Sequence, residues 1–229
     1  MKHIKRLLFI LILIAIVVTG VYINKGYNLY KTAIEKEPIE EVVKQIQEDE
    51  DFVAIEDIPK NYVNAVIAVE DRRFYKHNGV DIISIGRAVF TDIKNMKLVE
   101  GGSTITQQVA KNNLFTQEKK LERKIAEIFA SFDLEKICTK DEIFELYVNT
   151  CYYGEGFYSI KDAAEGYFGK EPKDMNLYEC TLLAGIPNAP SVYAPTKNPE
   201  LARERQAQVI SKMIKNKYLT VEQAKSIGF

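Results

Sequence analysis

An uncharged apolar stretch near the amino terminus constrains the fold of this chain more than any other feature. No residue between Leu7 and Asn24 is charged, and residues 7–18 consist only of Leu, Ile, Phe, Ala and Val. At ~1.5 Å per residue, a helix of this length covers most of a ~30 Å hydrocarbon core, and Lys5 and Arg6 can snorkel to extend it. The sequence therefore predicts one transmembrane helix over residues 7–24.

The residues on either side of this stretch predict how the chain meets the membrane. The basic tail, residues 1–6, favours a cytoplasmic amino terminus, which would leave the rest of the chain outside the cytoplasmic membrane. A cleaved signal peptide is the alternative, but Val18-Thr19-Gly20 does not resemble an A-x-A cleavage site. Residues 25–51 are rich in Glu and Lys and contain Pro38 as a break, so we expect a stalk.

The composition beyond this anchor is that of a globular domain with balanced charge. The chain has 31 Lys and Arg against 32 Asp and Glu, so it lacks the basic excess that a general nucleic-acid binder needs. The two histidines exclude a histidine-rich metal site. The three widely spaced cysteines form no zinc ribbon, CxxC motif or disulfide scaffold, and we expect them to be buried free thiols.

Helix signals dominate the remaining domain, residues 52–229. Phe52, Val53 and Ile55 form only a brief apolar run, a short strand at most. Residues 187–199 hold four of the seven prolines and are predicted to form a rigid loop. The predicted fold class is all-α, with helices that begin at or near Pro59, Thr104, Asp141, Asn176, Pro199 and Thr220.

The first stretch that could carry chemistry is Glu70-Asp71-Arg72-Arg73-Phe74-x-x-His77-x-Gly79. Glu70 follows Val63, Val66 and Ile67 at helical spacing, so it falls on an apolar stripe. A carboxylate there is either a partly desolvated acid or a helix-end residue that pairs with a neighbouring arginine, and the residues alone favour the ion pair. We expect His77 to be a hydrogen-bonding strut and not a catalyst.

The second stretch is Gly101-Gly102-Ser103-Thr104, which runs into a helix. Free backbone N–H groups and the helix dipole favour an anion at such a start. The polar side chains of Thr104, Gln107, Gln108 and Lys111 share one side of this helix, which suits a phosphate or a sugar. No Walker lysine follows the glycines. An ordinary glycine turn before a capped helix is the alternative.

The third stretch is Arg123-Lys124-Ile125-Ala126-Glu127. Arg123 and Glu127 are neighbours at i and i+4 on the side away from the apolar stripe of Leu121, Ile125 and Phe132. Taken alone, this pattern indicates a solvated helix face with one weak ion pair.

Together, and in this order, the three stretches resemble the family 51 glycosyltransferases, the peptidoglycan glycosyltransferases that polymerise lipid II. The resemblance covers about residues 55–215. The matching strings are EDRRFYKHNGVD at 70–81, GGSTITQQVAKN at 101–112, RKIAEIFASFDLE at 123–135, KDEIFELYVNTCYYGEGFYSIKDAAEGYFGK at 140–170 and LLAGIPNAPSVYAP at 182–195. One departure is Ser159, where the family usually has a glycine after tyrosine, and we expect a changed loop there. No transpeptidase Ser-x-x-Lys or Lys-Thr-Gly string occurs, so the chain resembles the monofunctional type.

The resemblance implies a lysozyme-like domain of two lobes, the smaller and membrane-proximal one at about residues 80–100. It implies the following roles for matching residues. Glu70 would be the general base, and Glu127 would orient cations or share a divalent ion, Mg or Mn, with a diphosphate. No organic cofactor is expected. Substrate contacts are implied for Phe74, Ser103, Thr104, Gln107, Gln108, Lys111, Arg123 and Lys124.

The resemblance also implies partners and a location. The substrates would be lipid II and the growing glycan strand, joined by a β-1,4 linkage with inversion and release of polyprenyl diphosphate. The protein would lie in the bacterial cell membrane with one span and an extracytoplasmic catalytic domain. Membrane lipid is an expected partner, other cell-wall synthesis proteins are further candidates, and nucleic acid is not expected.

Two alternatives from other classes remain. A lysozyme-like glycan hydrolase would share the fold and the carboxylic acid, but it has no use for groups that hold a diphosphate. An inactive membrane-anchored scaffold would be expected to have lost Glu70, Lys111 or Glu127, and this sequence keeps all three.

Overall fold

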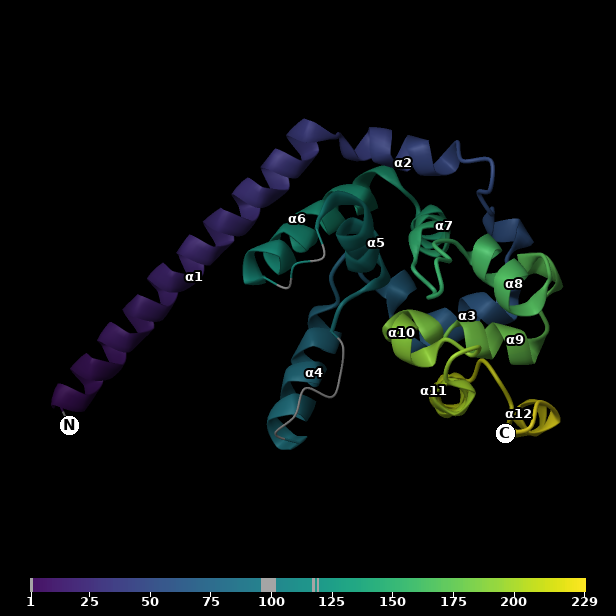
Figure 1. Ribbon diagram of the computed structural model, residues 1–229. Coiled ribbons are helices and arrows are strands. Elements are labelled where there is room, and N and C mark those ends of the chain that lie inside the picture. Colours follow the sequence, from purple (N-terminus) through teal and green to yellow (C-terminus); the bar gives the residue numbers. More distant parts are fainter. Residues whose placement is uncertain (1, 96–101, 117, 119) are drawn as a thin grey trace.

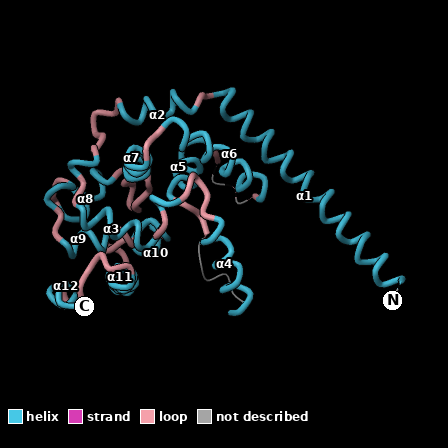
Figure 2. The backbone as a smooth tube through the Cα atoms, turned by 180° about the vertical axis from the view of Figure 1, so that it is seen from behind, coloured by secondary structure: helices cyan, strands magenta, loops and turns pink. Residues whose placement is uncertain are grey.

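The computed structural model describes residues 2–95, 102–116, 118 and 120–229. For residues 2, 89, 90 and 92–95 it describes the backbone alone. The described residues form helices and short 3-10 turns without a β-strand, so the predicted all-α class is confirmed (Figures 1 and 2). The α-helices are α1 (Lys2–Lys36), α2 (Ile39–Gln47), α3 (Lys60–Val69), α4 (Ile82–Asn95), α5 (Ile105–Leu114), α6 (Leu121–Ile137), α7 (Lys140–Thr150), α8 (Ile160–Phe168), α9 (Leu177–Leu183), α10 (Pro190–Tyr193), α11 (Pro199–Lys215) and α12 (Val221–Ser226). The 3-10 turns are η1 (Ile55–Asp57), η2 (Phe74–Lys76), η3 (Pro172–Asp174) and η4 (Ile186–Asn188).

Helix α1 is one continuous helix that extends away from the body of the domain (Figure 1). It is long and apolar enough to cross a membrane, and it is the one helix of the described part of the chain with this property. Every residue from 3 to 21 is exposed. An exposed apolar helix of this kind suits a hydrocarbon environment and not water.

Residues 25–51 pack on the domain, in contrast to the stalk that the sequence predicts. Pro38 separates α1 from α2, as expected. However, Tyr30, Ile39 and Val43 are buried and belong to the hydrophobic core. The apolar residues of α2 recur at helical spacing, so one of its faces is apolar despite its many charges. The overall composition of residues 25–51, rich in Glu and Lys, did not reveal this apolar face. The segment packs as part of the domain.

The core lies between α3 and the helices that surround it. Helix α3 packs against α9 and α11, while α5 packs against α6 and α7. A hydrogen bond of 2.8 Å joins the hydroxyls of the fully buried Tyr62, on α3, and Tyr153, in the segment after α7. The three cysteines are free and buried, as predicted: Cys138, Cys151 and Cys180.

The segment before α3 is extended and then turns into η1, so the short strand is absent there. The side chain of Asn149 takes the place of a partner strand. It accepts a hydrogen bond from the Val53 N–H and donates one to the Val53 carbonyl, each of 2.9 Å. The Glu145 carboxylate accepts a further hydrogen bond of 2.8 Å from the Ile55 N–H. Two side chains of α7 thus satisfy the backbone that a strand would have paired.

Two loops differ from expectation in instructive ways. The proline-rich residues 187–199 are not one rigid loop, because they contain the end of η4 and the short helix α10, which begins at Pro190. Ser159 has φ −137° and caps α8 by accepting a hydrogen bond of 3.0 Å from the Asp162 N–H. The position therefore needs no glycine, and serine stabilises the helix start.

Helix α4 projects from the body on its own (Figure 1) and corresponds to the smaller lobe that the resemblance implies. Ile82 and Ile83 are 79% and 59% exposed. The predicted lobe extends to about residue 100, and its residues 96–100, with the side chains of residues 89, 90 and 92–95, lie outside the part that the structure describes.

Candidate active site

The described residues enclose a cleft of about 700 Å³. Its lining residues come from the end of α3 and from α4, α5, α6, α10 and α11. Nine of the ten predicted site residues line it, namely Glu70, Ser103, Thr104, Gln107, Gln108, Lys111, Arg123, Lys124 and Glu127. The tenth, Phe74, is fully buried and packs on Phe144. It belongs to the hydrophobic core and does not line the cleft.

Glu70 lies at the carboxyl end of α3, with its side chain 12% exposed. One carboxylate oxygen accepts a hydrogen bond of 3.0 Å from Gln108 Nε2, and the other lies 3.5 Å from Arg205 Nη2. The sequence alone favoured a pairing with Arg72 or Arg73, but the ion-pair partner of Glu70 is Arg205. Arg73 Nε lies 3.0 Å from Asp81 Oδ2 instead. Glu70 is therefore a partly desolvated carboxylate fixed from two sides.

Arg205 is a cleft residue that the sequence analysis missed. Its guanidinium is buried, donates to the Gly185 carbonyl and to Gln208 Oε1, and lies over the ring of Tyr193. It shares the buried face of α11 with Ala202 and Val209. An arginine at apolar spacing on a helix is the signal that could have identified it, since such a residue is rarely buried without a partner.

The start of α5 is capped from within the protein. Thr104 and Gln107 form the predicted capping box, in which the Thr104 N–H donates to Gln107 Oε1 and the Gln107 N–H donates to Thr104 Oγ1. The Ile105 N–H donates to Asp71 Oδ2 at 3.2 Å. These three amides are therefore not available to an anion, in contrast to the expectation of free N–H groups. His77 Nε2 lies 2.9 Å from the same Asp71 oxygen and is the predicted strut.

Helix α6 brings two cations and a carboxylate to the opposite wall. Glu127 is only 1% exposed. Arg123 Nη1 donates to one of its oxygens, and Lys124 Nζ donates to the other at 2.8 Å. Lys124 also donates to Ser103 Oγ at 2.6 Å, which joins α6 to the segment before α5. The interpretation of this sequence as a solvated face with one weak ion pair is therefore wrong.

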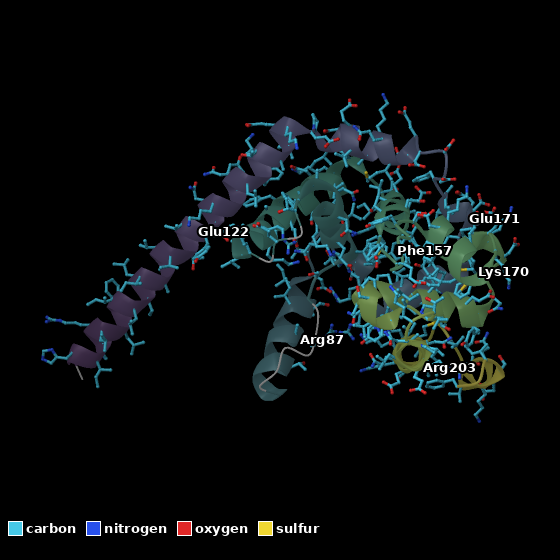
Figure 3. All side chains as sticks on the ribbon, in the orientation of Figure 1. Arg87, Glu122, Phe157, Lys170, Glu171 and Arg203 are labelled. Carbon is cyan, nitrogen blue, oxygen red and sulfur yellow. The ribbon has the colours of Figure 1, made fainter. Side chains whose placement is uncertain are left out.

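The charge of the cleft is basic, although the whole chain has a net formal charge of −1. Its lining contains four acidic residues, namely Glu70, Asp71, Asp81 and Glu127. It contains eight basic residues, namely Arg72, Arg87, Lys111, Arg123, Lys124, Arg205, Lys212 and Lys215. Arg87 extends from α4 at one edge (Figure 3). Such a cleft attracts an anionic group and repels a cationic one.

The residues around Glu127 do not by themselves form a metal site. In the described part of the chain no three His, Cys, Asp or Glu side chains gather where they could hold a metal ion. Both oxygens of Glu127 already accept hydrogen bonds from cations. A divalent ion would have to compete with these cations for Glu127 and take most of its ligands from a bound substrate.

Known proteins with similar sequences identify the family. Residues 35–214 match the family described as Transglycosylase. The chain is 43% identical to penicillin-binding protein 1F of Bacillus subtilis over 185 residues, which are 81% of this chain and 26% of that protein. It is 43% identical to penicillin-binding protein 1A of Aquifex aeolicus over 172 residues, 75% of this chain and 24% of that protein.

A Cupriavidus necator protein named as a transglycosylase is 45% identical over 164 residues, which are 72% of this chain and 71% of that protein. The chain spans about a quarter of the length of the two penicillin-binding proteins. All of the residues that line the cleft, apart from Lys215 and Asn216, fall within the matched range. This chain therefore belongs to the transglycosylase family.

Proposed function

We propose that this protein is a peptidoglycan glycosyltransferase that polymerises lipid II into β-1,4-linked glycan strands. The observation that carries the proposal is the pairing, within one cleft, of a fixed carboxylate, Glu70, with a cationic cluster. The cationic cluster consists of Lys111, Arg123 and Lys124. A carboxylate can take a proton from an attacking hydroxyl, and cations can stabilise a departing diphosphate. Family membership and the penicillin-binding relatives support the same activity.

In this proposal Glu70 is the general base. The 4-hydroxyl of the acceptor GlcNAc attacks C1 of the donor MurNAc, and Glu70 accepts the hydroxyl proton as the new bond forms. Gln108 and Arg205 hold the carboxylate in one orientation through their contacts with its two oxygens. Direct displacement inverts the α-linkage to β and needs no covalent intermediate on the protein.

The cationic cluster acts on the leaving group. Negative charge grows on the polyprenyl diphosphate as the C1–O bond breaks, and charges that are already in place stabilise that state most. Glu127 keeps Arg123 and Lys124 in position through its two oxygens. Mg or Mn at Glu127 stays a prediction, and no step of this proposal depends on it.

We further propose that the domain works outside the cytoplasmic membrane of a bacterium, anchored by α1. The exposed apolar helix α1 supports a membrane-anchored protein. The substrates would be lipid II and the growing strand, and membrane lipid would contact the anchor and α4. Other cell-wall synthesis proteins remain candidate partners.

One assay separates this function from its alternatives. The full-length protein is reconstituted in lipid vesicles with radiolabelled lipid II, and the products are resolved by gel electrophoresis. A ladder of long glycan strands is expected. Cleavage of added glycan without polymerisation would favour a lysozyme-like hydrolase, and no reaction with either substrate would favour an inactive scaffold.

A further inference from the structure

The burial pattern of α1 changes at one point along the helix. Residues 3–21 are exposed throughout, whereas Gly26 and Tyr30 are buried against α6. The uncharged stretch ends at Asn24 and Lys25 follows it. The position at which α1 is expected to leave the hydrocarbon core is therefore also the position at which it begins to contact the domain.

Gly26 allows an unusually close approach of α1 to α6. A Cβ atom at this position would lie 2.5 Å from Ile125 Cβ and 2.9 Å from the Glu122 carbonyl oxygen. Glu122 is labelled in Figure 3, where α6 runs beside α1. At Gly20, in the same helix, a Cβ would meet nothing within 4 Å. Only a residue without a side chain permits this contact at position 26.

Aromatic residues of the next turn fix the contact. The ring centroid of Phe129 lies 5.2 Å from that of Tyr27 and 5.8 Å from that of Tyr30. The Tyr30 hydroxyl donates a hydrogen bond to the Asp133 carboxylate. Burial and this hydrogen bond raise the pKa of Tyr30. The contact is therefore a packed and hydrogen-bonded interface, whose partners sit on one face of α6.

The opposite side of α6 carries part of the cationic cluster. Arg123 and Lys124 are the two residues that directly precede Ile125. At ~1.5 Å per residue, these cations lie within about 3 Å of the Gly26 contact along the α6 axis. Any movement of the contact along α1 would carry the cations with it, because both belong to one rigid helix.

We propose that the contact between α1 and α6 sets the depth of the cationic cluster at the level of the lipid phosphates. Gly26 follows Asn24 by two residues, which is about 3 Å along the helix axis. The headgroup layer on each side of a ~30 Å core is about 5–7 Å thick. The cluster thereby meets a lipid-linked diphosphate where the bilayer presents it. Gly26 is a positioning residue in this scheme, which rests on the proposed function for its chemistry but not for its geometry.

The first test measures depth without using activity. Leu121, an exposed residue at the start of α6, is replaced in Leu121→Cys and labelled with a nitroxide. The three natural cysteines are buried and should react slowly. In vesicles, the label on the parent protein should lie at the depth of the lipid headgroups. In Gly26→Leu the label should lie further out from the bilayer, towards water. Gly20→Leu is the matched control and should leave the depth unchanged.

The second test compares two substrates of the same variants. One is lipid II in vesicles, and the other is a short-chain, water-soluble lipid II analogue in detergent. Because small misplacements are costly to catalysis, Gly26→Leu should lose about tenfold or more in vesicles and less than about twofold with the soluble analogue. Gly26→Ala, which must also displace Ile125, should fall between Gly26→Leu and the parent protein.

The outcomes separate the possible failures. In Gly26→Leu, an unchanged label depth or an unchanged rate in vesicles would overturn the proposal. An equal loss of rate with both substrates would also overturn it, because that result indicates a general structural role. If the parent protein polymerises neither substrate, the proposed function fails, and the depth measurement with its Gly20→Leu control still decides the positioning role.

Discussion

The Arg205 guanidinium lies 3.5 Å from the carboxylate of Glu70, although the two residues come from opposite ends of the domain sequence. Helix α11, near the carboxyl end of the chain, thus completes a site that begins at the end of α3. Arg205 is itself anchored by the Gly185 carbonyl and by Gln208. The carboxylate of Glu70 and the guanidinium that supports it are therefore held by separate parts of the fold.

Glu70→Gln should fold normally and lose nearly all polymerisation. The amide retains the shape of the side chain but cannot accept the proton of the attacking hydroxyl, so we expect a loss of about 10²–10⁴-fold in rate. The measurement is glycan synthesis from lipid II, with Glu165→Gln, at an exposed position of α8, as the control. A Glu70→Gln rate above about a third of the parent rate would remove this residue from the role of base.

Arg205→Lys should lower turnover while the thermal stability changes little. A lysine keeps the positive charge but cannot contact Glu70, Gly185 and Gln208 at once, because it lacks the planar fork of donors. Steady-state kinetics should show a lower kcat and a similar KM, since the residue orients the base and is not proposed to bind substrate. Arg203→Lys, on an exposed part of the same helix, is the control, and a fall of equal size there would refute the idea.

Lys111→Ala and Arg123→Ala should each reduce turnover more than substrate affinity. A charge-assisted contact that strengthens as the diphosphate leaves contributes roughly 2–4 kcal/mol to the transition state. Arg123→Lys should restore only part of the rate, because an ammonium contacts phosphate as a point charge. Lys136→Ala, at an exposed position of α6, controls for loss of charge. Near-normal turnover in Arg123→Ala would show that its pairing with Glu127 has no catalytic consequence.

Asp81→Asn should destabilise the protein at neutral pH and have less effect in acid. Burial raises the pKa of Asp81, but hydrogen bonds from Ser84 and the charge of Arg73 outweigh it, and the net pKa is lowered. A lowered folded-state pKa gives stability that is present above the unfolded pKa and is lost as pH falls through the folded value.

The difference in free energy of unfolding should therefore be about 1.5–3 kcal/mol near neutral pH and should shrink below about pH 4. Urea unfolding followed by circular dichroism measures it, with Asp57→Asn at an exposed site as the control. A difference that is the same at neutral and acidic pH would mean that Asp81 acts through shape and not through its charge.

Two truncations should differ in stability. Removing residues 1–21 leaves the α1–α6 contact intact, whereas removing residues 1–30 deletes Tyr27 and Tyr30 and exposes Phe129. The aromatic contacts alone contribute about 0.5–1.5 kcal/mol each beyond area burial. The longer truncation should therefore unfold at a lower urea concentration. Equal midpoints would show that α1 does not stabilise the domain.

Local signals in the sequence predicted local structure well. The capping boxes of Thr104 with Gln107 and of Asn176 with Glu179 begin α5 and α9 as expected, because a cap depends on residues only three positions apart. The same is true of Pro59, which precedes α3. The all-α class follows from the sum of such signals.

The properties that depend on distant residues could not be predicted in this way. The neighbours of Glu70 come from α5 and α11, so its nearest arginine in sequence is not its partner. Phe74 sits in a matching motif, yet its ring is turned into the core. The charged surface of residues 39–47 masked an apolar face that only its contact with the body reveals. Sequence spacing is blind to each of these relationships, since tertiary packing decides them.

The buried carboxylate of Glu127 has a consequence for the protein at rest. Because it takes hydrogen bonds from both Arg123 and Lys124, it cancels part of their mutual repulsion before any ligand arrives. The cleft can then assemble during folding without a phosphate as a template. A buried carboxylate between two cations thus lets the protein maintain a basic cleft that attracts anions.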